Sequence, residues 1–303
     1  MSDATLTAEN IAPFESNKDP YPDLPTLAPD KLQEGDVLMM LGEGWANIGP
    51  VSLPVSWLIR VLDGGAYSHS AMVSFINGLP HVWDHSQEWK LSPVPLAEAI
   101  KDHKWCHVYR LIKHGEQVGS KRYPPAPIVK VLNEHQGDPY DKVLLFMAGI
   151  AAVISRMPDN PELRELVRAG LDTLIVALNW WLDRKDIRSG MLICTAVTGM
   201  SYWAAVNKVV HDYALEVDIQ RRGQIDSDEK WDETITELKR ALARIWTDFS
   251  SELARFEQLA ASNAHWVDVG GPLLPVNLIS PADLEFSRTL KAVGRLEISK
   301  RVS

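Results

Sequence analysis

The sequence predicts an α+β fold in which an antiparallel sheet carries added helices. Two patterns lead to this prediction. Between residues 32 and 112 short segments are either continuously apolar or alternate between apolar and polar residues, as strands do, whereas after residue 121 the apolar residues recur at the spacings of helices. Hydrophobic residues make up 46% of the 303 positions, so the chain can bury a full core.

Four segments carry the strand pattern. They are residues 37–41, 69–75, 81–85 and 105–112. Asn77-Gly78 lies between the second and the third segment, and this dipeptide is a strong signal for a tight turn between antiparallel strands. We therefore expect these two segments to pair as a β-hairpin.

Several further segments have the apolar spacing of helices. They are residues 52–63, 96–103, 126–136 and 165–183, and a segment that begins near residue 229. In the last of these, Ile235, Leu238 and Leu242 belong to one apolar stripe, which we expect to pack on the domain; contact with a partner protein is the alternative. Ser280-Pro281 has the residue types of a helix N-cap and a first helical position.

The chain is expected to form a single domain over residues 32–303, with helical insertions at about residues 147–187 and 204–262. Residues 1–31 are polar and rich in proline, which predicts a flexible N-terminal segment. This segment has neither the basic nor the apolar region of a signal peptide, and no apolar run reaches the ~18 residues of a transmembrane helix. A cytoplasmic location is the default expectation, with export by a specialised secretion system as the alternative.

The composition argues against several classes of function. The formal net charge is −9, whereas nucleic-acid-binding proteins normally carry a basic excess, so we do not expect nucleic acid as a partner. The two cysteines, Cys106 and Cys194, do not have the spacing of a disulfide framework or a zinc site, and no HExxH or CxxC pattern occurs. We expect neither a metal nor another cofactor.

Cys194 stands near the start of an apolar segment, residues 193–206, which we expect to form a helix. A helix N-terminus favours the thiolate, the nucleophilic form of cysteine, and its unpaired backbone N–H groups can stabilise an oxyanion. The alternative is a buried cysteine of the core. Cys106 lies in an alternating strand segment with no helix after it, so we interpret it as structural.

His69 and Asp84 could serve such a nucleophile. Strand alternation puts His69 on the more apolar face of its segment, with Ala71; a hydrogen-bonded histidine of the core is the alternative interpretation. Across the predicted hairpin, Asp84 can face the imidazole of His69 and orient it, which is the role of the third group in a catalytic triad. His81 and His85 are alternatives for that role. Alternation places both on the face opposite Asp84, so we prefer Asp84.

Six motifs occur in a fixed order along the chain. They are GDVLMML (35–41), YSHSAMV (67–73), HVWDHS (81–86), QGDPYDKVLLF (136–146), ICTAVTGMSYW (193–203) and LISPADLEFS (278–287). In this order the chain resembles the permuted branch of the NlpC-like papain-fold superfamily, the YiiX/YaeF-like group, and more distantly lecithin retinol acyltransferase. The resemblance covers roughly residues 32–146 and 188–296. It implies a circularly permuted papain-like fold, because the histidine and the carboxylate precede the cysteine.

The resemblance also implies roles for single residues. Cys194 would be the nucleophile, His69 the general base and Asp84 the orienting group, while Tyr140 would support the substrate pocket. Two departures stand out. Thr195-Ala196 follows the cysteine where the family often has Ser-Glu, and the third position is Asp84 where Glu or His is more usual. A shorter carboxylate reaches less far, which keeps His81 as the alternative.

The function expected from this resemblance is hydrolysis of an amide or ester bond through a thioester on Cys194. The substrate would be a cell-wall peptide, reached by a delivered antibacterial effector, or a lipid acyl group. Residues 147–187 could then form a lid or an acyl groove, and Trp180-Trp181 could make peripheral contact with a membrane. The alternatives are a membrane-associated acyltransferase and a non-catalytic binding scaffold with the same fold.

Overall fold

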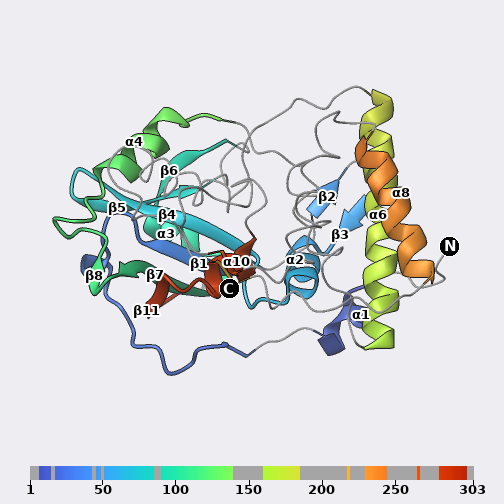
Figure 1. Ribbon diagram of the computed structural model, residues 1–303, viewed down its shortest axis with the longest axis horizontal. Coiled ribbons are helices and arrows are strands. Elements are labelled where there is room, and N and C mark those ends of the chain that lie inside the picture. Colours follow the sequence, from blue (N-terminus) through green and yellow to red (C-terminus); the bar gives the residue numbers. More distant parts are fainter. Residues whose placement is uncertain are drawn as a thin grey trace.

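The computed structural model describes ten stretches of the chain. They are residues 7–14, 18–42, 46–48, 51–84, 90–138, 160–184, 217–218, 229–243, 265–266 and 280–298. Over these stretches the fold is α+β, with a seven-stranded antiparallel sheet at one end of the molecule and a pair of long helices at the other (Figure 1). This agrees with the fold class that the strand and helix patterns predict.

The sheet has the strand order β11-β7-β1-β4-β5-β6, and β8 pairs with the far end of β7. Its strands are β1 (Val37–Gly42), β4 (His69–Ile76), β5 (Leu79–Asp84), β6 (Ser92–Pro95), β7 (His103–Lys113), β8 (Glu116–Gln117) and β11 (Leu290–Leu296). The four predicted strands are therefore confirmed as β1, β4, β5 and β7. The alternation did not predict β6 and β11, which lie at the two edges of the sheet. Prolines in β6 fit its edge position, because proline donates no ladder hydrogen bond.

The turn between β4 and β5 is confirmed at Asn77-Gly78. Both residues have positive φ angles, 53° and 78°, as a tight turn between right-handed twisted strands requires. The pairing that follows places Ile76 opposite Leu79 and Met72 opposite Trp83. This register decides which side chains of the two strands share a face.

The sheet is buried on both faces. On one face, the helix α4 (Ala126–Glu134) packs through Ile128 and Leu132 against a cluster that includes Tyr109. On the other face, the helix α3 (Leu96–Ile100) packs against a cluster that includes Ala71, Val73, Val82 and Cys106. His69 belongs to the second face, because it shares the strand alternation of Ala71 and Val73.

Two short helices connect the sheet with the rest of the molecule. The helix α2 (Val55–Asp63) ends at Gly64, whose φ of 70° is the left-handed conformation of a helix C-cap. The helix α10 (Pro281–Glu285) begins with a capping box between Ser280 and Asp283, which confirms the predicted N-cap. The carboxylate of Asp63 accepts a hydrogen bond of 2.6 Å from the backbone N–H of Ala282, so the end of α2 and the start of α10 are joined.

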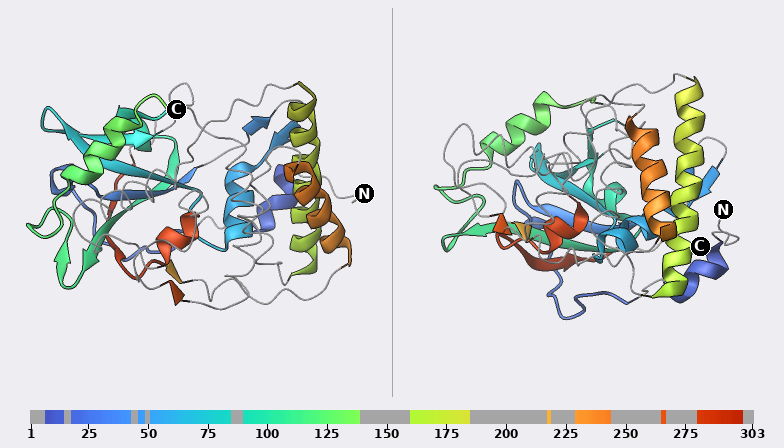
Figure 2. Two further views of the ribbon diagram at one scale, coloured as in Figure 1. Left: turned by 45° about the horizontal axis from the view of Figure 1, so that its top comes forward. Right: turned by 45° about the vertical axis from the view of Figure 1, so that its right-hand side comes forward.

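The helices α6 (Pro161–Arg184) and α8 (Glu229–Ala243) lie side by side and apart from the sheet (Figure 2). α6 also contacts α2 and the strand β3 (Val51–Leu53), which pairs with β2 (Ala46–Ile48). In α8, Ile235 and Leu238 are buried, so the described part of the apolar stripe packs within the molecule. Both helices fall inside the two ranges predicted as insertions. A further two-stranded pair joins β9 (Val217–Asp218) to β10 (His265–Trp266). None of the described helices combines the length and the apolar character needed to cross a bilayer.

The N-terminal part of the chain differs from the flexible segment that its composition predicts over residues 1–31. The helix α1 (Ala8–Ile11) and two 3-10 helices (Ala12–Phe14 and Pro29–Lys31) form there, and residues 18–31 run along the sheet (Figure 1). The backbone of Arg295 in β11 exchanges hydrogen bonds of 2.8 and 2.9 Å with Leu27 and Pro25. These backbone hydrogen bonds attach residues 25–27 to the edge strand β11, a long-range contact that their polar sequence does not predict.

Candidate active site

His69 and Asp84 come together at the side of the sheet where β4 begins and β5 ends. The Nε2 atom of His69 lies 2.9 Å from the Oδ1 atom of Asp84. One step beyond the Met72–Trp83 pair, the register puts Asp84 opposite Ala71, so Asp84 and His69 are diagonal neighbours on one face of the hairpin. Diagonal neighbours on paired strands are close enough for a histidine and a carboxylate side chain to contact each other.

Asp84 and His69 are both largely buried, and the side chain of His69 is the more exposed of the two. The side chain of Asp84 is 5% exposed and that of His69 is 20% exposed. An ionised carboxylate can only accept hydrogen bonds, so Nε2 of His69 carries the donated proton and Nδ1 is the nitrogen with basic character. The arrangement therefore fixes both the ring orientation and the tautomer of a partly exposed imidazole, which are the properties of a general base held by a third group.

His81 lies away from this pair. Its partners in the register are Ser74 and Pro95, on the face of β5 opposite Asp84. Its Nδ1 atom is 3.0 Å from the backbone carbonyl of Leu79 in the same strand. Of the alternatives for the group beside His69, the structure places Asp84 there and not His81.

Two predicted site residues, Cys194 and Tyr140, lie outside the described residues, as does His85. Cys106 is described: it is fully buried in the middle of β7, and burial raises the pKa of its thiol. A buried neutral thiol among apolar neighbours is a poor nucleophile. This agrees with the structural role that its sequence context indicates.

A third side chain, His103, completes the cluster and was not found from the sequence. Its ring lies nearly parallel to that of His69, with 5.9 Å between the ring centroids and 17° between the planes. Burial, and to a smaller extent the neighbouring His69, lower the pKa of His103 to about 4, against smaller opposing effects of Asp84 and Asp102. At neutral pH His103 is therefore an uncharged ring beside His69.

The lowered pKa of His103 predicts how stability depends on pH. The unfolded chain binds this proton near pH 6.5 and the folded chain only near pH 4, so the stability associated with the neutral ring is complete above pH 6.5 and is lost as the pH falls toward 4. The loss is at most about 1.4 kcal/mol per pH unit. Urea denaturation near pH 7 and near pH 4.5 should show a smaller acid loss in His103→Phe than in the unchanged chain. The buried His107 is present in both proteins, so its effect cancels; equal losses would contradict the prediction.

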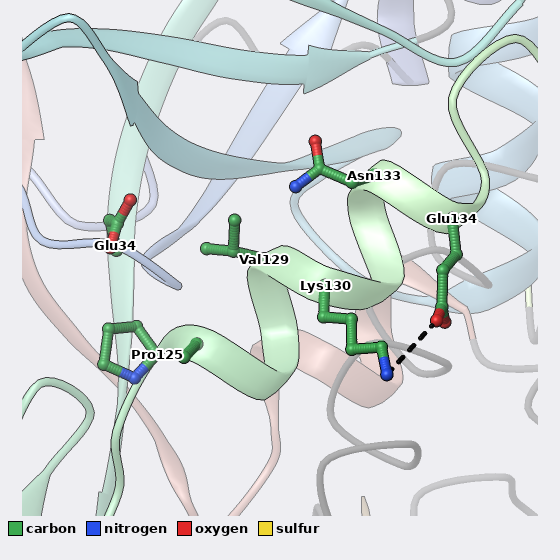
Figure 3. Close-up of a pocket in the computed structure, with 7 residues that line it drawn as sticks. Glu34, Pro125, Val129, Lys130, Asn133 and Glu134 are labelled. Carbon is green, nitrogen blue, oxygen red and sulfur yellow. Dashed lines mark ion pairs between the residues drawn. The ribbon is translucent and has the colours of Figure 1, made fainter.

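A separate groove runs along α4 (Figure 3). This helix packs on the face of the sheet opposite to that of His69. It is lined by Glu34, Pro125, Ala126, Val129, Lys130, Asn133 and Glu134. Lys130 forms an ion pair of 3.6 Å with Glu134 on its exposed rim. Glu34 precedes β1, whereas His69 pairs with Met40 near the other end of that strand, so the groove is not part of the candidate active site.

Among the described residues, no group of three or more histidine, cysteine and acidic side chains is arranged to hold a metal ion. No protein-family model matches the sequence, and no curated protein matches it. Among solved structures, the chain is similar to the metalloprotein YiiX from Escherichia coli O157:H7, with a TM-score of 0.39 and 13% identity over 88% of this chain and 98% of that chain. YiiX gives its name to the group that the sequence motifs resemble.

Proposed function

We propose that this protein is a cysteine hydrolase with a circularly permuted papain-like, NlpC-like fold. It would cleave an amide or ester bond through a thioester on Cys194, with His69 as the general base and Asp84 as the group that orients it. The observation that carries the proposal is the 2.9 Å hydrogen bond between Nε2 of His69 and the largely buried carboxylate of Asp84.

Three features support the assignment. His69, preceded by Ser68, is the first residue of β4, and Asp84 is the last residue of the neighbouring strand β5, which is the order expected for the permuted NlpC-like group. His69 is partly exposed, so a reacting group can approach its ring. The cluster also lies on paired strands of the central sheet, and such strands hold a catalytic geometry more tightly than loops do.

The reaction would proceed in two acyl transfers. Nδ1 of His69 takes the proton of the Cys194 thiol, and the thiolate attacks the carbonyl carbon of the substrate. As the tetrahedral intermediate collapses, the imidazolium gives its proton to the departing amine or alcohol, and a thioester remains. Water then transfers a proton to Nδ1 of His69 and attacks the thioester. The C–S bond breaks, the carboxylic acid leaves, and the imidazolium returns the proton to the sulfur of Cys194. The Asp84 carboxylate accepts from Nε2 throughout and stabilises the imidazolium stage.

The proposed substrates are cell-wall peptides, for a protein delivered as an antibacterial effector, or lipid acyl groups. Both have a carbonyl next to a leaving amine or alcohol, so the same three groups would serve either. Peptidoglycan fragments and acyl-lipid vesicles, each assayed for release of the amine or alcohol, distinguish the two. Transfer of the acyl group to an added alcohol or amine instead of water would assign the protein as an acyltransferase.

The reactivity of Cys194 tests the proposal without knowledge of the substrate. We expect iodoacetamide to modify Cys194 below pH 7 at a rate at least about a hundredfold above that of Cys106, because a nearby imidazolium favours the thiolate. In His69→Ala that low-pH reaction should disappear. Mass spectrometry of the two cysteine peptides measures both rates in one sample.

Cys106 is the internal reference, because it is the other of the two cysteines and is fully buried. His81→Ala is the matched control for the loss of a histidine, since His81 lies on the other face of β5. If Cys194 reacts no faster than Cys106, or if His69→Ala leaves its rate unchanged, the hydrolase assignment fails and a non-catalytic binding scaffold takes its place.

A further inference from the structure

The pairing between β1 and β7 contains an irregularity next to the candidate active site. From Val37 to Leu41 the two strands pair in a constant register that ends with Leu41 opposite Trp105, but Gly42 then pairs with His103. One residue of β7, Lys104, is therefore extra, which is the signature of a β-bulge. Bulges of this kind change which side chains of a strand point to a given face.

The bulge determines which residue of β7 lies on the same face of the sheet as His69. In a regular strand, His103 would share the face of Trp105, which belongs to the cluster on the α4 side of the sheet. The extra residue reverses the alternation, so that His103 joins the face of Cys106 and His69. The two imidazole rings meet there with their planes 17° apart and their centroids 5.9 Å apart.

The position opposite His103 is occupied by a glycine. A Cβ atom on Gly42 would lie 3.2 Å from the Oγ atom of Ser56 and 4.0 Å from Cδ2 of His103, which is tight against the serine. The backbone N–H of Gly42 donates a hydrogen bond of 3.2 Å to the Oγ atom of Ser68, the residue before His69. The end of β1 is thus tied to the start of β4 beside the ring of His103.

We propose that His103 is a positioning residue of the candidate active site. Its ring covers one face of the His69 imidazole and holds it in the orientation in which Nε2 meets Asp84 and Nδ1 faces the nucleophile. The consequence for Cys194 rests on the proposed function, whereas the effect on the His69 ring does not.

The chemistry of the cluster explains why the covering ring should be flat and uncharged. A flat ring can lie parallel to His69 within the offset-stacked range of aromatic pairs. The groups that face His103 are His69 from β4, Asp84 from β5, and Asp102 and the backbone carbonyl of Ile100 from the segment before β7. A second positive charge among them would oppose the imidazolium that His69 must form during catalysis. Neutral His103 covers the ring without that repulsion.

The test compares His103→Phe, which keeps a flat uncharged ring, with His103→Ala, which removes it. Nitrogen NMR of the His69 ring near pH 8 reports its tautomer, and we expect the Nε2–H form to dominate in the unchanged chain and in His103→Phe. In His103→Ala we expect averaging of the two tautomers, because the ring can turn away from Asp84. The rate of Cys194 alkylation near pH 6 should fall about tenfold in His103→Ala and stay within about twofold in His103→Phe.

His81→Ala and His81→Phe are the matched controls and should change neither readout. If His103→Ala does not fold, His103→Leu replaces it, because leucine fills the volume without a flat ring. A His69 tautomer and a Cys194 rate that are both unchanged in His103→Ala would overturn the positioning role and leave His103 as a packing residue. If Cys194 is inert in the unchanged chain, the proposed function fails, and the tautomer of His69 alone decides the role of His103.

Discussion

Replacing Asp84 by asparagine is expected to lower the rate of the proposed hydrolysis by about 10²- to 10⁴-fold while the protein stays folded. The amide keeps the size of the side chain, but it removes the negative charge that stabilises the His69 imidazolium. An amide can also donate to a ring nitrogen as well as accept from one, so Nε2–H of His69 is no longer enforced. Both effects act on Nδ1, the atom that takes the proton of Cys194 in the proposed reaction.

The rate of Cys194 alkylation between about pH 5 and pH 9 measures this effect before any substrate is known. In Asp84→Asn the reaction below pH 7 should be strongly reduced, and the nitrogen NMR signals of His69 should show a mixture of tautomers. Asp102→Asn is the matched control, because it removes an exposed carboxylate just before β7, whereas Asp84 bonds to His69 within the hairpin of β4 and β5. Similar behaviour of Asp84→Asn and the unchanged chain would show that the His69–Asp84 hydrogen bond is structural.

Replacing Arg110 by methionine is expected to lower the free energy of unfolding by about 3–5 kcal/mol. Arg110 donates two hydrogen bonds of 2.7 Å to the carboxylate of Asp36 and one of 3.1 Å to the backbone carbonyl of Lys31. Asp36 is fully buried at the start of β1 and also accepts from the backbone N–H of Gln33. The substitution leaves this carboxylate buried without its counter-charge, and that is the main cost.

Urea denaturation of three variants separates two free energies: the cost of leaving the Asp36 carboxylate buried without its partner, and the net stabilisation that the ion pair provides. Arg110→Met should be far less stable than the unchanged chain, and the double variant Asp36→Leu with Arg110→Met should recover much of the loss, since a buried pair is often replaceable by apolar residues. Lys130→Met breaks an ion pair whose side chains are 57% and 50% exposed, and it should cost less than about 1 kcal/mol. If Arg110→Met costs no more than Lys130→Met, the buried pair does not stabilise the fold.

The pair of Asp36 and Arg110 lies at the opposite end of β1 from the candidate active site. Val37 pairs with Tyr109 next to the ion pair, whereas Met40 pairs with His69. We therefore expect Arg110→Met to change stability without changing the reactivity of Cys194 in the folded protein. The two predictions thus separate the groups that hold the sheet from those that would perform the chemistry.

Local rules were sufficient for the hairpin that carries His69 and Asp84. The period of two along a strand put both residues on one face, and the turn at Asn77-Gly78 fixed the register between their strands. The two strands are consecutive in the sequence, so the turn between them sets their register. The face and the register together bring His69 and Asp84 within hydrogen-bonding distance. Apolar spacing likewise located the helices α2, α4, α6 and α8.

The same rules could not find His103. A bulge adds one residue to a strand, and the choice of strand depends on how β1 and β7 pair across more than sixty residues of chain. A strict period of two places His103 on the wrong face, so its contact with His69 is invisible without the register. The pairing of the edge strand β11 with β7, and that of residues 25–27 with β11, are also long-range contacts. These segments contain polar residues or glycine, so they lack the apolar pattern from which a strand is predicted.

The sequence by itself determined the α+β class, the central strands and the facing of His69 and Asp84, because these depend on contacts between residues close in the chain. The tertiary structure decided that His103 stacks on His69, that the N-terminal segment lies along β11, and that Asp36 and Arg110 form a buried pair. Each of these depends on which distant segments become neighbours in the sheet. That choice is made by the packing of the whole core and not by any local pattern.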